Sequence, residues 1–116
     1  MTQARVEAAK QAINEALALF QQRWLLRVVW ELRAGPLTFR QLQEQCGGLS
    51  PSVLNQRLGE LRDAGLLDRG GEADGGGYRL APLGLALLEA FAPLTQWALR
   101  WQRQRSRSRP AAAEGE

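Results

Sequence analysis

A five-residue turn between two short predicted helices constrains the fold of this chain more than any other feature. The turn reads Gly47-Gly48-Leu49-Ser50-Pro51. Its glycines end a helix predicted over residues 38–46. Ser50 supplies the N-cap, and Pro51 the first residue, of a helix predicted over residues 50–64. This order presents the second helix on a rigid platform.

The remaining pattern predicts three more helices and a hairpin. Apolar residues recur at spacings of three and four over residues 3–21, 24–33 and 82–103, and the middle segment is expected to be the buried central helix. Short β-compatible segments flank a glycine-rich loop over residues 70–77. The predicted fold class is therefore mainly α with a small β-hairpin, a winged helix-turn-helix with N- and C-terminal dimerisation helices. We expect one domain over residues 1–103 and a disordered Arg/Ser-rich tail over 104–116.

The helix over residues 50–64 has two chemically different faces. Leu54, Leu58 and Leu61 form its buried stripe, so Ser52 and Gln56 point the opposite way. Such polar side chains in the first two turns can read base edges or donate to phosphates. The alternative is a solvated face of a packing module.

These patterns select candidate DNA contacts. Base edges are assigned to Ser52, Asn55 and Gln56. Phosphates are assigned to Thr38, Arg40, Ser50, Arg57, Arg69 and Arg79. An ion pair with Glu60, three residues on, is the alternative for Arg57. The tip of the wing carries Glu72 and Asp74, so the wing's contribution has to come from the two arginines at its base.

The last predicted helix carries an apolar seam that extends beyond what a small core can cover. Large aromatics left at a chain end usually find a partner surface. We therefore expect a homodimer built from the first and last helices, with these contacts: Ile13, Leu17, Phe20, Leu87, Phe91, Leu94, Trp97 and Trp101. In the alternative, the last helix folds back on its own domain. Pro93 is expected to kink or interrupt that helix.

Composition excludes several classes of function. The chain of 116 residues has no histidine and one cysteine, so no His-based catalysis, cysteine pair or metal site is expected, and we predict neither an enzyme nor a cofactor. Charged residues interrupt the longest apolar run, so we predict no membrane span and a soluble, cytoplasmic protein. Cys46 is expected to be a buried small hydrophobe. The excess basic charge lies at residues 100–109, either a solvated extension or an arm on DNA phosphates.

Together, these residues resemble the HxlR-type winged-helix transcriptional regulators, relatives of the MarR group. The resemblance covers residues 13–101, and its strongest part is the run Leu49–Leu61 followed by Ala64-Gly65-Leu66. Trp24, Gly35-Pro36 and Tyr78-Arg79-Leu80 support it. The resemblance implies a dimeric DNA-binding regulator with its fourth helix in the major groove and its terminal helices at the dimer interface.

The functional hypothesis is a homodimeric regulator that binds double-stranded DNA at a pseudo-palindromic operator. The alternative is a winged-helix interaction module that has lost specific DNA binding, which the acidic wing and the bare Gly59 favour. A subsidiary hypothesis is that apolar space between the helices of the dimer binds a small-molecule effector.

Overall fold

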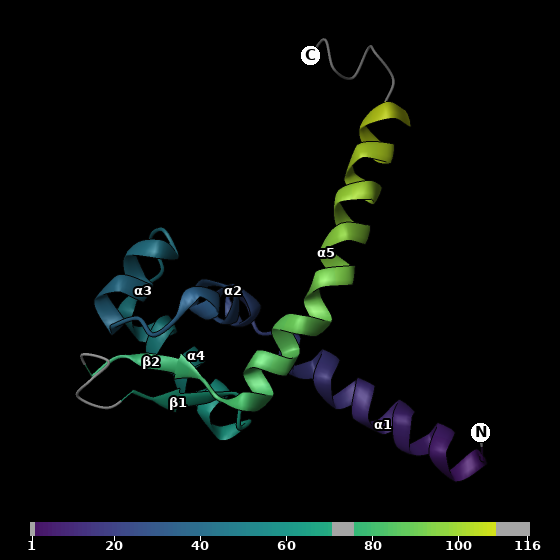
Figure 1. The fold of residues 1–116 in the computed structure, drawn as a ribbon, viewed down its shortest axis with the longest axis horizontal. Helices are drawn as coiled ribbons and strands as arrows, with labels where there is room; N and C mark the ends of the chain where they lie inside the picture. The colour runs from purple at the N-terminus through teal and green to yellow at the C-terminus, as the bar shows by residue number, and fades with distance from the viewer. Residues whose placement is uncertain (1, 71–75, 109–116) are drawn as a thin grey trace.

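The computed structural model describes residues 2–70 and 76–108 and shows a mainly helical chain with a two-stranded antiparallel hairpin (Figure 1). The elements follow the order α1 (Gln3–Phe20), α2 (Leu25–Glu31), the 3-10 turn η1 (Leu32–Ala34), α3 (Phe39–Gln45), α4 (Pro51–Asp63), β1 (Leu67–Arg69), β2 (Tyr78–Leu80) and α5 (Pro82–Ser108). The predicted winged helix-turn-helix fold class is confirmed.

The core forms around α2, as expected for the central helix. Leu25, Val28 and Val29 of α2 are fully buried. The leucines predicted as the inner stripe of α4 pack against them, and the hairpin closes the core from the other side with Leu67 and Leu80. Each fully buried side chain of this size contributes about 1.5–3 kcal/mol through removal from water. The winged-helix body therefore has its own apolar core.

Local capping explains where α3 and α4 begin. The Thr38 hydroxyl accepts a hydrogen bond from the Gln41 amide, and the Gln41 side chain accepts one from the Thr38 amide, which completes a capping box. The Ser50 hydroxyl accepts from the Val53 amide, and Pro51 occupies the first turn of α4. Gly47 and Gly48 follow α3 with φ values of 64° and 97°, which glycine adopts without strain. The predicted caps are confirmed.

The hairpin is held in register and joined by a third segment. Leu67 pairs with Leu80, and Arg69 with Tyr78. Leu37 adds an isolated bridge: its amide donates to the Tyr78 carbonyl at 3.0 Å, and the Tyr78 amide donates back at 2.7 Å. This bridge, which the sequence pattern did not predict, ties the start of α3 to the wing. The predicted acidic tip, with Glu72 and Asp74, lies outside the described residues.

The two terminal helices extend away from this body (Figure 1). None of the residues of α1 is buried, and beyond its first turns α5 is exposed. The Cα radius of gyration is 17.8 Å, whereas a compact chain of about 100 residues has about 13 Å. The apolar faces of both arms therefore lack a covering surface within the described part of the chain.

α5 is one long helix that continues past residue 103, where it was predicted to end. Pro93 lies inside the helix without interrupting it. The helix continues to Ser108, so the predicted disordered tail does not begin at residue 104. A lone missing amide is tolerated within a long helix, and the Arg105 guanidinium packs 4.6 Å from the centroid of the Trp101 ring, which supports the last turns. The predicted tail over residues 109–116 lies outside the described residues.

Candidate nucleic-acid interface

The outer face of α4 presents the polar side chains expected there. Ser52, Asn55 and Gln56 are all exposed, opposite the buried leucine stripe. The Ser50 cap holds the first turn, whose free backbone amides point outward along the helix axis. The three side chains assigned to base edges are thus brought together on one accessible surface.

The residues assigned to phosphates on α3 are accessible to different degrees. The Arg40 side chain is 88% exposed and pairs with Glu44 at 3.4 Å. An ion pair this exposed contributes little and leaves the guanidinium available for another anion. Thr38 is half-buried, and its hydroxyl oxygen already accepts the capping bond, so only the hydroxyl proton remains to donate.

Arg57 differs from the other assigned residues because its side chain turns inward. It is only 11% exposed. One guanidinium nitrogen donates to Glu60 at 2.8 Å, so the expected ion pair is present. The Nε donates to the backbone carbonyl of Arg23, a contact across 34 residues of sequence that no local pattern could indicate. A phosphate contact by Arg57 would require these partners to be released.

Arg69 and Arg79 lie at the base of the wing on exposed positions of β1 and β2. The Arg69 guanidinium lies 5.9 Å from the centroid of the Tyr78 ring. Arg79 pairs with Asp68 across the two strands, so an acidic side chain lies beside it on the same face of the hairpin. Their phosphate contacts stay predictions.

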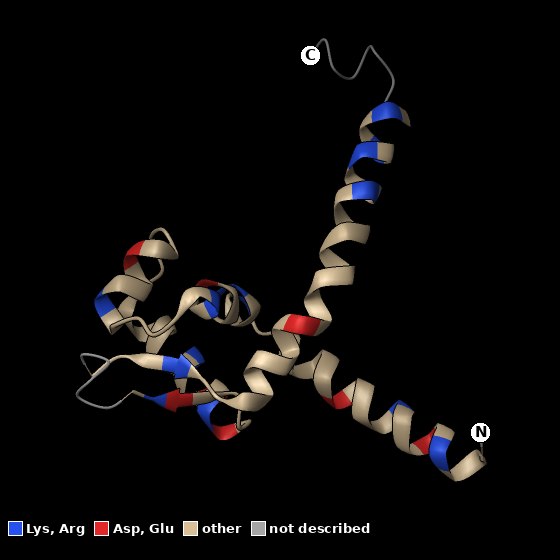
Figure 2. Cartoon of the chain, in the orientation of Figure 1, with Lys and Arg blue, Asp and Glu red and all other residues tan. Residues whose placement is uncertain are grey.

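Charge is mixed over the winged-helix body and one-signed at the end of α5. Figure 2 shows Lys/Arg and Asp/Glu interspersed around α2 to α4 and the hairpin, whereas the last turns of α5 carry basic residues alone. The body of residues 1–99 holds ten basic and ten acidic side chains. Any DNA attraction of the body therefore has to come from local placement and not from net charge.

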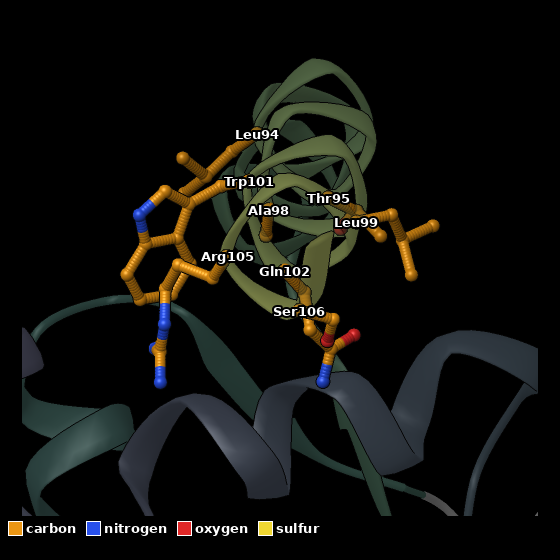
Figure 3. Close-up of a pocket in the computed structure, with 8 residues that line it drawn as sticks. All are labelled: Leu94, Thr95, Ala98, Leu99, Trp101, Gln102, Arg105 and Ser106. Carbon is orange, nitrogen blue, oxygen red and sulfur yellow. The ribbon is translucent and has the colours of Figure 1, made fainter. Parts of the chain in front are cut away.

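The distal half of α5 is an open apolar surface. Trp97 and Trp101 stack with ring centroids 5.7 Å apart, and both are about half exposed. Figure 3 views this half close to the helix axis: Leu94, Trp101 and Arg105 project to one side, and Leu99 to another. All residues lining this hollow come from α5 itself. The surface is therefore a helix face that no other element within residues 2–70 and 76–108 covers.

Cys46 is buried, as predicted, at the C-terminal end of α3. Burial raises the pKa of its thiol, the Glu31 carboxylate raises it further, and Arg27 opposes them. The thiol therefore stays protonated and is a poor nucleophile. Within residues 2–70 and 76–108, no three potential metal-ligating side chains gather, and no helix has the length and apolarity to cross a bilayer.

Comparison with known proteins finds helix-turn-helix proteins both by family model and by sequence similarity. Residues 19–106 match the family model for HxlR-like helix-turn-helix proteins. The helix-turn-helix-type transcriptional regulator YvaP of Bacillus subtilis is 28% identical over 91 residues, which cover 76% of this chain and 84% of YvaP.

Solved structures agree with this match. A MarR-family transcriptional regulator from Enterococcus faecalis V583 superposes with a TM-score of 0.73 at 29% identity, covering 84% of this chain and 92% of that one. Quinone-bound YodB from B. subtilis gives 0.71 at 27% identity, covering 78% and 98%. The repressor BigR from Xylella fastidiosa, at 23% identity and a TM-score of 0.70, covers 80% of this chain and 92% of its own, and it shares the fold.

Proposed function

The chain belongs to the family of HxlR-like helix-turn-helix transcriptional regulators, and from this premise we propose that it binds a pseudo-palindromic operator as a homodimer. Each copy of α4 enters a major groove, and the two copies lie about 34 Å apart along the duplex. The observation that carries this proposal is the exposed polar face at the capped end of α4. Ser52, Asn55 and Gln56 meet base edges there.

The terminal helices support the dimer. Ile13 and Leu17 on α1, and Leu94, Trp97 and Trp101 on α5, are each about half exposed. The other three predicted contacts, Phe20, Leu87 and Phe91, pack partly against the protomer's own core. Large apolar side chains exposed on helix faces in this way are typical of protein–protein interfaces. A second copy that covers α1 and α5 would bury it.

An effector site is a subsidiary part of the proposal. The space between α1 and the start of α5 is an apolar groove, lined by Ala16, Leu19 and Phe20 of α1, Leu66 before β1, and Leu83 and Leu87 of α5. YodB, a structural relative, has been crystallised with a quinone. A small apolar effector in this groove would contact both arms and could alter their angle, and with it the affinity for DNA.

The competing candidate is an interaction module without specific DNA binding. The inward placement of Arg57 and the neutral charge of residues 1–99 favour it. Selection of bound sequences from random duplexes separates the two. A regulator enriches inverted repeats whose half-site centres lie about 10 base pairs apart. An interaction module enriches none, and it gives no specific gel-shift band even at low salt.

Two substitutions test the assigned contacts. Gln56→Ala should relax discrimination at one base-pair position by about 1–3 kcal/mol, because a base-edge contact is lost. Arg40→Ala should weaken binding to all sequences alike and lower the salt slope by about 1, because a phosphate contact is lost. Gel-shift titrations over a salt series measure both. Arg5→Ala, which removes the same charge near the free end of α1, is the control, and equal losses for Gln56→Ala and Arg40→Ala would contradict the assignments.

A further inference from the structure

We propose that Arg57 is a positioning residue that fixes α4 against the junction between α1 and α2, and that it thereby sets the separation of the two recognition helices in the dimer. The inference rests on the proposed function, since it assumes that α1 carries dimer contacts and that α4 enters DNA. It goes beyond that function by assigning the half-site spacing to one side chain that need not touch DNA.

The junction itself is held in an unusual conformation. Apart from glycines, Trp24 alone among the described residues has a positive φ, at 77°, in the left-handed region. A tryptophan is strained there, and such strain persists only where the surroundings over-determine the backbone. The Leu25 amide donates to the Gln22 carbonyl at 3.1 Å, and the Arg23 guanidinium lies 5.6 Å from the Trp24 ring centroid. Arg23 and Trp24 together therefore set the direction in which α1 leaves the body.

Arg57 connects this junction to α4 with a two-pronged contact. Its Nε donates to the Arg23 carbonyl at 2.5 Å, and its Nη1 donates to the Glu60 carboxylate at 2.8 Å. Only an arginine offers two donors in such a fixed fork. The side chain is 11% exposed, whereas that of Arg62 on the same helix is 71% exposed. Arg57 is thus part of the interior contact, and Arg62 is not.

The partly buried carboxylate of Glu60 depends on its ion pair with Arg57. Its second carboxylate oxygen is buried and has no hydrogen-bond partner among the residues that the structure describes. The ion pair with Arg57 is therefore the main compensation for a partly buried charge. Loss of Arg57 would leave the carboxylate poorly satisfied and favour a rearrangement that exposes it.

Because α1 is long, a small change of angle at the junction produces a large displacement of its free end. Its 18 residues span about 27 Å. A rotation of about 10° at the junction would move the free end of α1 by about 5 Å, more than the rise of one base pair of about 3.4 Å. Gln56, assigned to base edges, immediately precedes Arg57. A loosened junction would therefore let the two recognition helices adopt several separations.

The test compares wild-type protein and Arg57→Ala on duplexes that carry the selected inverted repeat with spacers one or two base pairs shorter or longer. Wild type should prefer one spacing by about tenfold, comparable to the cost of a mismatched base pair. Arg57→Ala should reduce this preference to about twofold while its affinity for a single half-site and its dimerisation are retained. Arg62→Ala, an exposed arginine on the same helix, should behave as wild type.

A measurement without DNA keeps this inference separate from the proposed function. Hydrogen exchange of the Gln22 and Leu25 amides should accelerate by about tenfold in Arg57→Ala, because the junction opens more often. The Tyr78 amide of the hairpin and the Ala81 amide that follows it should keep their rates. If Arg57→Ala does not fold, Arg57→Lys serves instead, since a single ammonium cannot reproduce the fork, and it should show smaller changes in the same direction.

The outcomes are distinguishable. If wild type binds no specific duplex, the proposed function fails, and the exchange rates decide whether Arg57 holds the junction. Unchanged junction exchange overturns the inference. So does an unaltered spacing preference combined with a uniform loss of affinity, as for Arg40→Ala, because Arg57 would then contact phosphate directly.

Discussion

A chain carrying Leu17→Glu together with Trp97→Glu is expected to be a monomer and to lose at least about a hundredfold in operator affinity, because specific binding draws on both half-sites. Both side chains are about half exposed in the protomer, so their replacement removes little from the core. In a dimer built on α1 and α5, each glutamate would be buried without a partner, which is strongly unfavourable. Sedimentation and gel shift on the selected operator measure the two effects.

A matched control separates interface burial from charge alone. Gln3→Glu with Gln104→Glu adds the same two charges to the same helices at exposed polar positions. This variant should remain a dimer and bind DNA with a modest loss from added repulsion. The helical circular dichroism of both variants should match wild type. A Leu17→Glu, Trp97→Glu chain that stays dimeric, or a monomer with full operator affinity, would refute the proposed assembly.

The features that could be predicted from sequence are those fixed by local chemistry. The Thr38 and Ser50 caps act within three residues of themselves, so their sequence context was enough. The leucine stripe of α4 follows from helical period alone. The exposure of Ser52, Asn55 and Gln56 follows from the same geometry, and the fold class followed from the order of these elements.

The features that could not be predicted depend on contacts between distant segments. The Arg23 carbonyl that accepts from Arg57 lies 34 residues away, and the bridge between Leu37 and Tyr78 joins segments on either side of α4. The continuation of α5 past residue 103 was missed for a different reason: the Arg/Ser-rich composition indicated a tail, whereas the residues to Ser108 are helical and Arg105 packs on Trp101 one turn before it. Arg57 shows how such distant contacts change the interpretation of the site. Its residue type indicated a phosphate contact, whereas the fold places its guanidinium against interior partners.

The second large effect is expected at Gly84, in the first turn of α5. This glycine is buried, and a Cβ there would lie inside van der Waals contact of the Leu66 carbonyl oxygen and 3.1 Å from a methyl carbon of Leu80. The carbonyl cannot retreat freely, because it accepts a hydrogen bond from the Ala81 amide at 3.0 Å. Gly84→Ala should therefore lower the free energy of unfolding by about 3 kcal/mol, as overpacking in a core does.

Gly59 in α4 provides the opposite expectation for the same substitution. A Cβ there would meet only the end of the Arg62 side chain, at 3.8 Å. Gly59→Ala should therefore stabilise the chain by about 0.5–1 kcal/mol, the ordinary preference of a helix interior for alanine. Thermal unfolding at one fixed protein concentration compares the two, since the stability of a dimer depends on concentration. Gly84→Ala should melt more than about 10 °C below wild type and Gly59→Ala slightly above it. Helix propensity favours alanine over glycine at both sites, so only the close approach of α5 to Leu66 can make Gly84→Ala destabilising. If both variants are more stable than wild type, α5 does not pack against Leu66.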